Sequence, residues 1–195
     1  MLNPVSYFMK FLMLLLSLGL LSACQLMAPK TDEPLKTQAD LSPEIVQKYN
    51  QAIKLMESGN EDAALKVFDG VSKLNDTLAG PYVNRGLIYL KQGEKEKSEQ
   101  AFRDALQRND KSVTALNQLG ILLREKKDFA AARKNYEAAL AVDDSHLNAH
   151  LNLGVLCDIY LQDKTCAMQH YKAYQNLVAD DEQVNNWIID LQGRL

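Results

Sequence analysis

The chain has 195 residues, which is enough for one domain with a hydrophobic core. Apolar residues make up 47% of it, a fraction that excludes an intrinsically disordered polypeptide. The formal net charge is −3 and the basic residues are scattered along the sequence. Because nucleic-acid backbones are bound by concentrated basic surface, we expect no nucleic acid among the partners.

Residues 1–23 have the pattern of a secretory signal peptide. Lys10 precedes the mostly apolar run 11–20, which is too short to span a bilayer comfortably. The following residues, Leu21-Ser22-Ala23-Cys24, resemble the lipobox of bacterial lipoproteins, whose cysteine is acylated and becomes the first residue of the mature protein. An ordinary cleaved signal followed by a chance cysteine is the alternative.

The lipobox resemblance implies lipidation of Cys24 and a membrane anchor. Gln25 stands where an aspartate retains such proteins at the inner membrane, so the expected location is the periplasmic face of the outer membrane. The acyl chains of a lipoprotein exceed the two signals that stable anchoring requires. Residues 24–41 contain Pro29, Pro34 and many polar side chains. We expect them to form a flexible tether that holds the domain about 20–25 Å from the membrane.

A period of 34 residues runs through the rest of the chain. A glycine, a small residue and an aromatic residue all recur at this step. The three sets are Gly86, Gly120 and Gly154; Ala64, Ser98 and Ala132; and Phe68, Phe102 and Tyr136. This pattern resembles the tetratricopeptide repeat, in which the glycine and the small residue let two antiparallel helices approach closely and the aromatic side chain fills the space beside them.

The tetratricopeptide resemblance implies an all-α fold, a tetratricopeptide-repeat α-solenoid of four helical hairpins plus a C-terminal capping helix. The units are expected at about residues 45–78, 79–112, 113–146 and 147–181 within the array 42–181, and the capping helix at 182–195. The last helix shows an amphipathic stripe formed by Val184, Trp187, Ile188, Leu191 and Leu195. A stripe of this kind covers the open apolar end of a solenoid, and a partner-binding tail is the alternative.

Local signals mark the expected helix ends. Ser42 and Pro43 predict a capped helix start, and Gly59, Gly93 and Asp128 predict the inner turns. The closing proline of the repeat is replaced by aspartates, which we expect to cap the next helix: Asp76, Asp110 and Asp144.

Two further departures from the repeat concern its spacing and its glycine. Unit one has Ala52 in place of the glycine, which is tolerable by size. Unit four carries one extra residue before Ala167 and Tyr171. That hairpin is therefore expected to have a longer or altered turn.

The first helix of each hairpin lines the concave side in such stacks, and three rows of residues follow it. One row is carboxamide, and it can pair with a peptide backbone or link neighbouring hairpins: Asn50, Asn84, Gln118 and Asn152. The second is aliphatic, and it can seat apolar side chains of a peptide or form core between repeats: Ile53, Leu87, Ile121 and Val155. The third is mixed: Tyr49, Val83, Asn117 and Leu151. The expected partner-binding residues are Tyr49, Asn50, Asn84, Leu87, Asn117, Gln118, Leu151 and Asn152.

Two cysteines remain once Cys24 is assigned to lipid. Cys157 lies late in the first helix of unit four and Cys166 early in the second, so antiparallel geometry brings them near each other. In an oxidising compartment this predicts a disulfide, with two buried free thiols as the alternative.

The histidines give no clear metal site. His146 and His150 are four residues apart beside two aspartates, but no third ligand stands at useful spacing, and His150 occupies a packing position of the repeat. His170 is expected to be isolated. No phosphate-binding glycine loop, nucleophile elbow or paired-carboxylate motif is recognisable, so we expect no enzyme, no cofactor and no small-molecule substrate.

A lipobox, a short tether and a tetratricopeptide array together resemble the pilotin-type lipoproteins of type IV pilus biogenesis, although those typically have more units. The ending Trp187-Ile188-Ile189-Asp190-Leu191 resembles tetratricopeptide proteins associated with TonB/ExbB-type energy-transducing or motility complexes. An adaptor for peptidoglycan hydrolases is a third possibility. All three imply a non-catalytic scaffold whose partner is another envelope protein.

Overall fold

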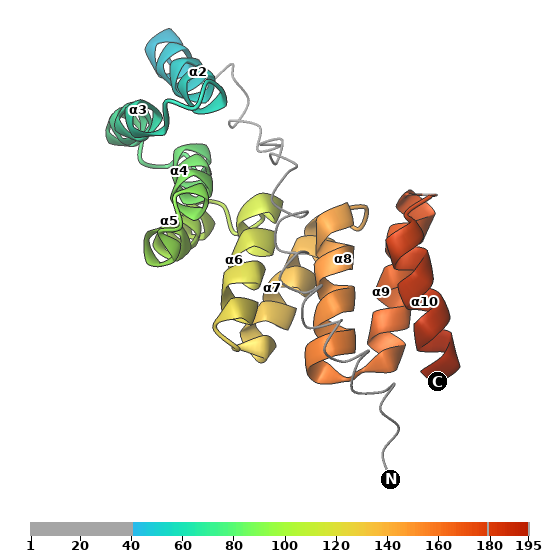
Figure 1. The fold of residues 1–195 in the computed structure, drawn as a ribbon. Coiled ribbons are helices and arrows are strands. Elements are labelled where there is room, and N and C mark those ends of the chain that lie inside the picture. Colours follow the sequence, from blue (N-terminus) through green and yellow to red (C-terminus); the bar gives the residue numbers. More distant parts are fainter. Residues whose placement is uncertain (1–40, 179, 195) are drawn as a thin grey trace. The chain divides into compact units, whose positions relative to one another are not determined.

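A computed structural model describes residues 41–178 and 180–194, which form helices joined by turns, with no strand among them. The helices pair as antiparallel hairpins, followed by α10 (Glu182–Arg194) (Figure 1). Hairpin 1 is α2 (Pro43–Glu57) and α3 (Glu61–Leu74); hairpin 2 is α4 (Gly80–Lys91) and α5 (Lys95–Arg108); hairpin 3 is α6 (Val113–Glu125) and α7 (Phe129–Val142); hairpin 4 is α8 (Leu147–Val155), its π-helical continuation η2 (Leu156–Leu161) and α9 (Lys164–Leu177). The predicted all-α stack of four hairpins and a closing helix is confirmed.

The segments expected before residue 41 lie outside the described residues: the signal peptide, Cys24 and the tether up to residue 40. Leu195 lies outside them as well. Among the helices that the structure does describe, none combines the length and the apolar character needed to cross a bilayer.

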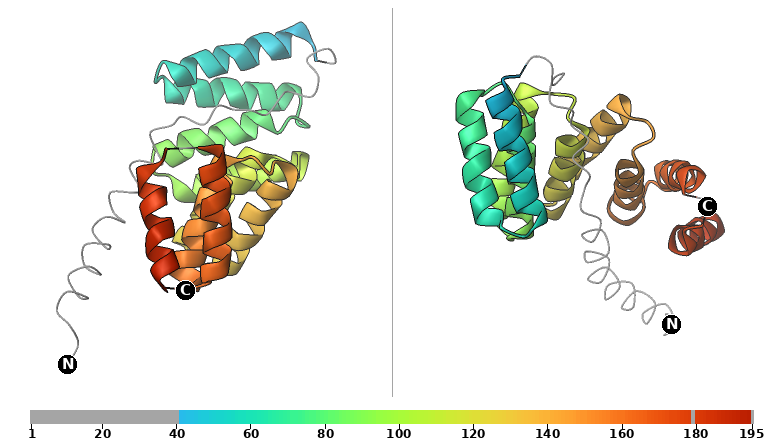
Figure 2. Two further views of the ribbon diagram at one scale, coloured as in Figure 1. Left: turned by 90° about the vertical axis from the view of Figure 1, so that its right-hand side faces the viewer. Right: turned by 90° about the horizontal axis from the view of Figure 1, so that it is seen from above.

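The hairpins stack in chain order, because each helix packs mainly against its neighbours in sequence; Figure 2 shows the stack from two further sides. One apolar cluster fills hairpin 1 and reaches Ile88 of hairpin 2, and a larger one runs from Ala79 to Leu191 of α10. Ion pairs join the inner-turn ends of neighbouring hairpins: Lys91–Glu61 at 2.5 Å, Lys95–Glu125 at 2.7 Å and Lys126–Glu99 at 2.5 Å. Their lysines are exposed, so each pair contributes about 0–1 kcal/mol and apolar burial dominates the stability of the stack.

The 34-residue period has a direct packing cause. A Cβ atom on Gly120 would lie 2.5 Å from Cε1 of Tyr136, and one on Gly154 would lie 2.6 Å from Cδ1 of Tyr171. Gly86 meets the ring of Phe102 in the same way, at 2.6 Å. Because these aromatic rings are fully buried, they cannot move aside for a side chain. The repeating glycine is therefore the contact surface for the aromatic ring of its own hairpin.

The extra residue of hairpin 4 lies inside the first helix rather than in a longer turn. Each inner turn contains one residue with positive φ: Gly59 (78°), Gly93 (77°), Lys127 (65°) and Gln162 (55°). The last step of this series is 35 residues instead of 34, yet the turn position itself is preserved. The surplus residue is taken up by η2, where each hydrogen bond spans five residues instead of four. The expected alteration therefore occurs before the turn.

The helix starts agree with the sequence at some positions and correct it at others. The side chain of Ser42 caps α2 as predicted, and Asp128, which was predicted only to mark an inner turn, also caps α7. The expectation that Asp76, Asp110 and Asp144 cap the following helices is wrong: the N-cap of α6 is Ser112, that of α8 is His146, and α4 has no side-chain cap. The preceding residue of each pair accepts a backbone N–H instead, at Asn75, Asn109 and Asp143. Such Asx turns close the hairpin and leave the cap to a later residue.

The closing helix α10 covers hairpin 4 with its predicted apolar stripe. Val184, Ile188 and Leu191 are buried, and the ring of Trp187 lies 5.4 Å from that of Tyr171. The matching face of the first hairpin is polar, since positions that are buried or half-buried against a neighbour in later hairpins are exposed in α2: Gln47, Asn50 and Lys54. This end of the described stack therefore presents little apolar surface to solvent.

Candidate partner-binding face

Two members of the carboxamide row, Asn84 and Asn152, form hydrogen bonds inside the helical stack. Asn84 is fully buried, and its Nδ2 donates to the hydroxyl oxygen of Tyr49 in hairpin 1 at 2.7 Å and to the carbonyl oxygen of Gly80 at 3.0 Å. In the second half of the stack, Nδ2 of Asn152 donates to Oδ1 of Asn117 at 3.1 Å, and both residues are buried. The bond from Asn84 to Tyr49 and the bond from Asn152 to Asn117 join neighbouring hairpins, so these side chains align one hairpin on the next.

These bonds narrow the set of residues that a partner is able to reach. Tyr49 is buried, and its ring also packs edge-on against Phe68 at 5.6 Å. Tyr49, Asn84, Asn117 and Asn152 would contact a partner only if the hairpins separated. Asn50 is exposed, because no described hairpin precedes it, and Gln118 is half-buried. Of the eight expected partner-binding residues, the accessible ones are Asn50, Leu87, Gln118 and Leu151.

The aliphatic row lies at the boundary between core and solvent. Its members contact the apolar clusters, yet each keeps part of its surface exposed: Ile53, Leu87, Ile121 and Val155. Met56 and Leu90, three residues after Ile53 and Leu87, are half-buried in the same way. The row therefore serves partly as core and partly as accessible apolar surface, one residue per hairpin.

Charged groups beside the inner turns are largely paired with one another. Burial of Glu99 opposes its ionisation, but hydrogen bonds from Lys126 and Arg103 outweigh burial and lower the pKa of its carboxyl. The guanidinium of Arg133 contacts Glu137 at 2.7 Å and Asp163 of hairpin 4 at 3.6 Å. Because these charges compensate each other, the accessible surface near the inner turns is not dominated by one sign.

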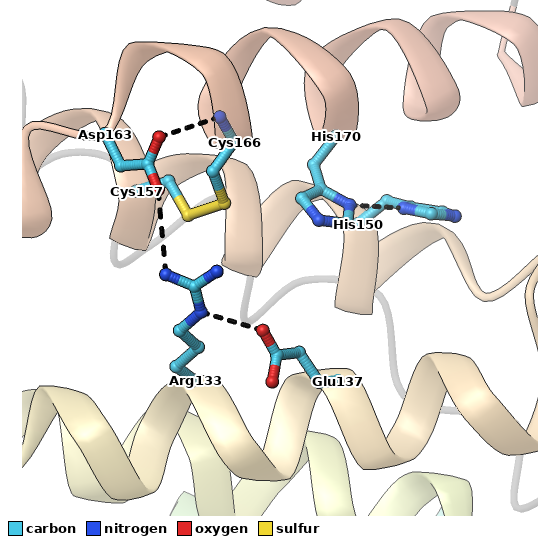
Figure 3. Close-up of a disulfide and its surroundings, with 7 residues drawn as sticks. All are labelled: Arg133, Glu137, His150, Cys157, Asp163, Cys166 and His170. Carbon is cyan, nitrogen blue, oxygen red and sulfur yellow. Dashed lines mark hydrogen bonds and ion pairs between the residues drawn. A yellow bond between two sulfur atoms is a disulfide. The ribbon is translucent and has the colours of Figure 1, made fainter.

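The two cysteines lie together in hairpin 4. Cys157 in η2 and Cys166 in the first turn of α9 form a disulfide with 5.8 Å between their Cα atoms (Figure 3). Both are buried, and Oδ1 of Asp163 caps α9 by accepting the N–H of Cys166 at 3.0 Å. The covalent link therefore encloses both the inner turn and most of η2, the segment that takes up the surplus residue.

The histidines form a pair that the sequence did not reveal. His150 Nε2 lies 2.8 Å from the carbonyl oxygen of Asp144, and its Nδ1 lies 3.0 Å from Nδ1 of His170 (Figure 3). A carbonyl only accepts, so Nε2 of His150 donates to Asp144; when both rings are neutral, Nδ1 of His150 accepts from His170. Burial, and then the charge of His150, lower the pKa of His170 to about 4.

The expectation of an isolated His170 is therefore wrong: its neighbour is His150 of the same hairpin, and this pairing depends on the register of α9 against α8. His146 caps α8 through Nδ1, which accepts the N–H of Ala149 at 3.1 Å. Within residues 41–178 and 180–194, no group of three or more histidine, cysteine or acidic side chains is arranged to hold a metal ion.

Comparison with known proteins gives a consistent match. The family model for the tetratricopeptide repeat matches residues 49–113, 83–134 and 117–182, more than half of the chain in total. The structure of MamA, residue 41 to the end, from Desulfovibrio magneticus RS-1 is 16% identical, with a TM-score of 0.67, and the match covers 78% of this chain and 86% of that one. The structure of PilF from Pseudomonas aeruginosa is 16% identical, with a TM-score of 0.67 and coverage of 77% and 68%. A tetratricopeptide repeat protein from Parabacteroides merdae is 17% identical, with a TM-score of 0.63 and coverage of 79% and 60%. At these identities the likeness shows the fold alone.

Proposed function

Because this chain belongs to the tetratricopeptide repeat family, whose arrays bind other proteins, we propose that it is a non-catalytic scaffold for assembly of a cell-envelope complex. In this proposal Cys24 carries the lipid anchor and the helical stack is held at the periplasmic face of the outer membrane. The partner is another envelope protein, bound along the first helices of the hairpins.

The observation that carries the proposal is the accessible aliphatic row. Ile53, Leu87, Ile121 and Val155 leave apolar surface in solvent on consecutive first helices, although the stack has buried apolar positions throughout. An apolar strip repeated along rigid elements favours a protein chain as its ligand, because each hairpin contributes one contact in a fixed position. The self-compensated charges near the inner turns argue against a strongly acidic or basic ligand.

Assembly of the type IV pilus secretin is the favoured process. The lipobox-like sequence and the fold shared with PilF support secretin assembly as the first process to test. Deleting the gene should reduce secretin multimers and pili while leaving uptake of iron complexes intact. Normal pili with impaired uptake, or with altered cell shape, would redirect the proposal to an energy-transducing complex or a wall hydrolase.

Binding is tested with matched serine substitutions. Leu87→Ser with Ile121→Ser removes two members of the aliphatic row, and Leu74→Ser with Val142→Ser removes two exposed apolar side chains from the ends of second helices. After cross-linking and purification identify the partner, the first pair should weaken its binding about tenfold or more, the loss of roughly 1.4 kcal/mol, and the second pair should not. If both double variants bind the partner with the same affinity as the parent, and their helical circular dichroism is unchanged, the aliphatic row is excluded as the binding face.

The anchor is tested separately from binding. Labelled palmitate and the mass of the mature N-terminal peptide should report acylation at Cys24, and Cys24→Ser should move the protein from the outer-membrane fraction to a soluble one. An unacylated native protein would remove the anchor from the proposal and leave the binding face untouched.

A further inference from the structure

The disulfide joins two positions whose equivalents are also in contact in hairpin 2. In hairpin 2 the equivalent positions are Tyr89 and Lys97, whose ammonium lies 5.5 Å from the ring centroid. These residues are eight apart in sequence, whereas Cys157 and Cys166 are nine apart. Cys157 and Cys166 thus face each other as Tyr89 and Lys97 do in a regular hairpin. The surplus residue lies between the two cysteines, in η2.

The disulfide loop also holds the last turn of α10. The carboxylate of Asp158, in η2, accepts from a terminal nitrogen of Arg194 at 3.0 and 3.3 Å, and it lies 3.5 Å from the hydroxyl of Tyr171. Lys164, also inside the loop, donates to the carbonyl oxygen of Arg194. The side chain of Asp158 is only 12% exposed, so this ion pair is partly protected from solvent.

The start of α10 is held by residues outside the loop. The hydroxyl of Tyr174 donates to Asp181 at 3.0 Å, and the amide of Gln175 donates to Asn185 at 2.5 Å. Both donors lie in α9 beyond Cys166. The two ends of α10 are therefore attached independently, one to the disulfide loop and one to the body of α9.

We propose that the Cys157–Cys166 disulfide is a redox-dependent latch for the last turn of α10. In the oxidised protein it fixes Asp158 and Lys164 where both contact Arg194. Reduction by a dithiol breaks the S–S bond, gives two thiols at Cys157 and Cys166, and oxidises the dithiol to a disulfide. The loop then loses its constraint, the last turn of α10 is released and Leu191 is uncovered, while the first turn stays attached.

The test is hydrogen exchange of the full chain, resolved to short peptides, with and without dithiothreitol. We expect exchange in residues 189–194 to rise about three- to tenfold on reduction, whereas residues 182–187 should change less than twofold. Alkylation followed by mass measurement verifies that both thiols have formed. Asp158→Asn should give the same rise in the oxidised protein and remove the response to dithiothreitol.

Asp190→Asn is the matched control, because Asp190 contacts Arg194 from within α10 at 2.8 Å and is not in the loop. This variant should keep its response to reduction. Unchanged exchange of residues 189–194 in fully reduced protein would overturn the latch. An equal rise along the whole of α10 would also overturn it, since that result reports general loss of hairpin 4. Cys157→Ser with Cys166→Ser gives the reduced state without a reductant and should match the reduced parent.

Discussion

Hairpins 3 and 4 share one packing plan and differ by one residue. In both, a glycine of the first helix contacts the tyrosine of the second, Gly120 with Tyr136 and Gly154 with Tyr171, at nearly the same separation. Hairpin 3 reaches its turn through an unbroken α-helix, whereas hairpin 4 changes from α8 to η2 after Val155, the residue that follows Gly154. An inserted residue is therefore tolerated when it lies beyond the glycine–tyrosine contact, because that contact sets how closely the two helices approach.

The difference also explains why cross-links gather in hairpin 4. A π-helix is rare and its geometry is less favourable than that of an α-helix, so the segment needs support from its surroundings. The disulfide and the ion pair of Asp158 with Arg194 join this segment to α9 and α10, and the histidine pair joins the start of α8 to α9. Hairpin 3 has none of these bonds at the equivalent positions that the structure describes.

The first prediction compares how much the buried tyrosine contributes to the free energy of unfolding in each of the two hairpins. Tyr136→Ala and Tyr171→Ala should each lower the free energy of unfolding by about 3–5 kcal/mol, because each removes a fully buried ring and leaves a cavity. Tyr171→Ala should lose more, since Tyr171 also contacts Trp187 and Asp158. Urea denaturation followed by circular dichroism measures both. A loss below about 1 kcal/mol at Tyr171 would mean that hairpin 4 is packed on a different plan.

The second prediction removes the covalent difference between the hairpins. Cys157→Ser with Cys166→Ser should lower the free energy of unfolding by about 2.5–3 kcal/mol, from the entropy of an open loop of this size in the unfolded chain. Leu123→Cys with Ala131→Cys places cysteines at the equivalent positions of hairpin 3, where a disulfide should form and raise stability. Thiol titration and urea denaturation report both. If the transplanted pair stays reduced in air, the two hairpins do not share this contact.

The sequence predicted the stack because its period has a simple physical cause. Contact with an aromatic ring requires a small residue at this position, so Gly86, Gly120 and Gly154 make the repeat visible. The site was less predictable. A carboxamide both donates and accepts, so the sequence cannot tell whether Asn84 bonds to a partner or to a neighbouring hairpin. The histidine pair depends on the register between α8 and α9, and the one-residue insertion made that register uncertain.

The third prediction concerns a pH dependence of stability that arises from His170 in hairpin 4 and has no counterpart in hairpin 3. The pKa of His170, about 4 in the folded chain, is below the usual value of about 6.5, so the unfolded state binds the proton more readily. The stabilisation is therefore complete above pH 6.5 and is lost as the pH falls toward 4, at a cost of about 1–2 kcal/mol after allowing for solvent screening. His170→Asn copies Asn135, the equivalent residue of hairpin 3, and should flatten this part of the pH dependence in thermal melts. All other titrating groups are shared by the parent and the variant. An equal loss of stability between pH 7 and pH 4.5 in both proteins would therefore contradict the lowered pKa of His170.

The smallest expected effect concerns the turns, where hairpins 3 and 4 agree with each other and differ from hairpins 1 and 2. Lys127 and Gln162 have positive φ at the position held by Gly59 and Gly93, and side chains raise the energy of that conformation. Lys127→Gly and Gln162→Gly should each raise the free energy of unfolding by about 0.5–1 kcal/mol, less than the full strain because glycine also gains freedom in the unfolded chain. Thermal melts of both variants provide the measurement. If only Lys127→Gly stabilises, then the disulfide and η2 already hold Gln162 in its conformation, and the strain at that turn is part of how hairpin 4 accommodates its extra residue.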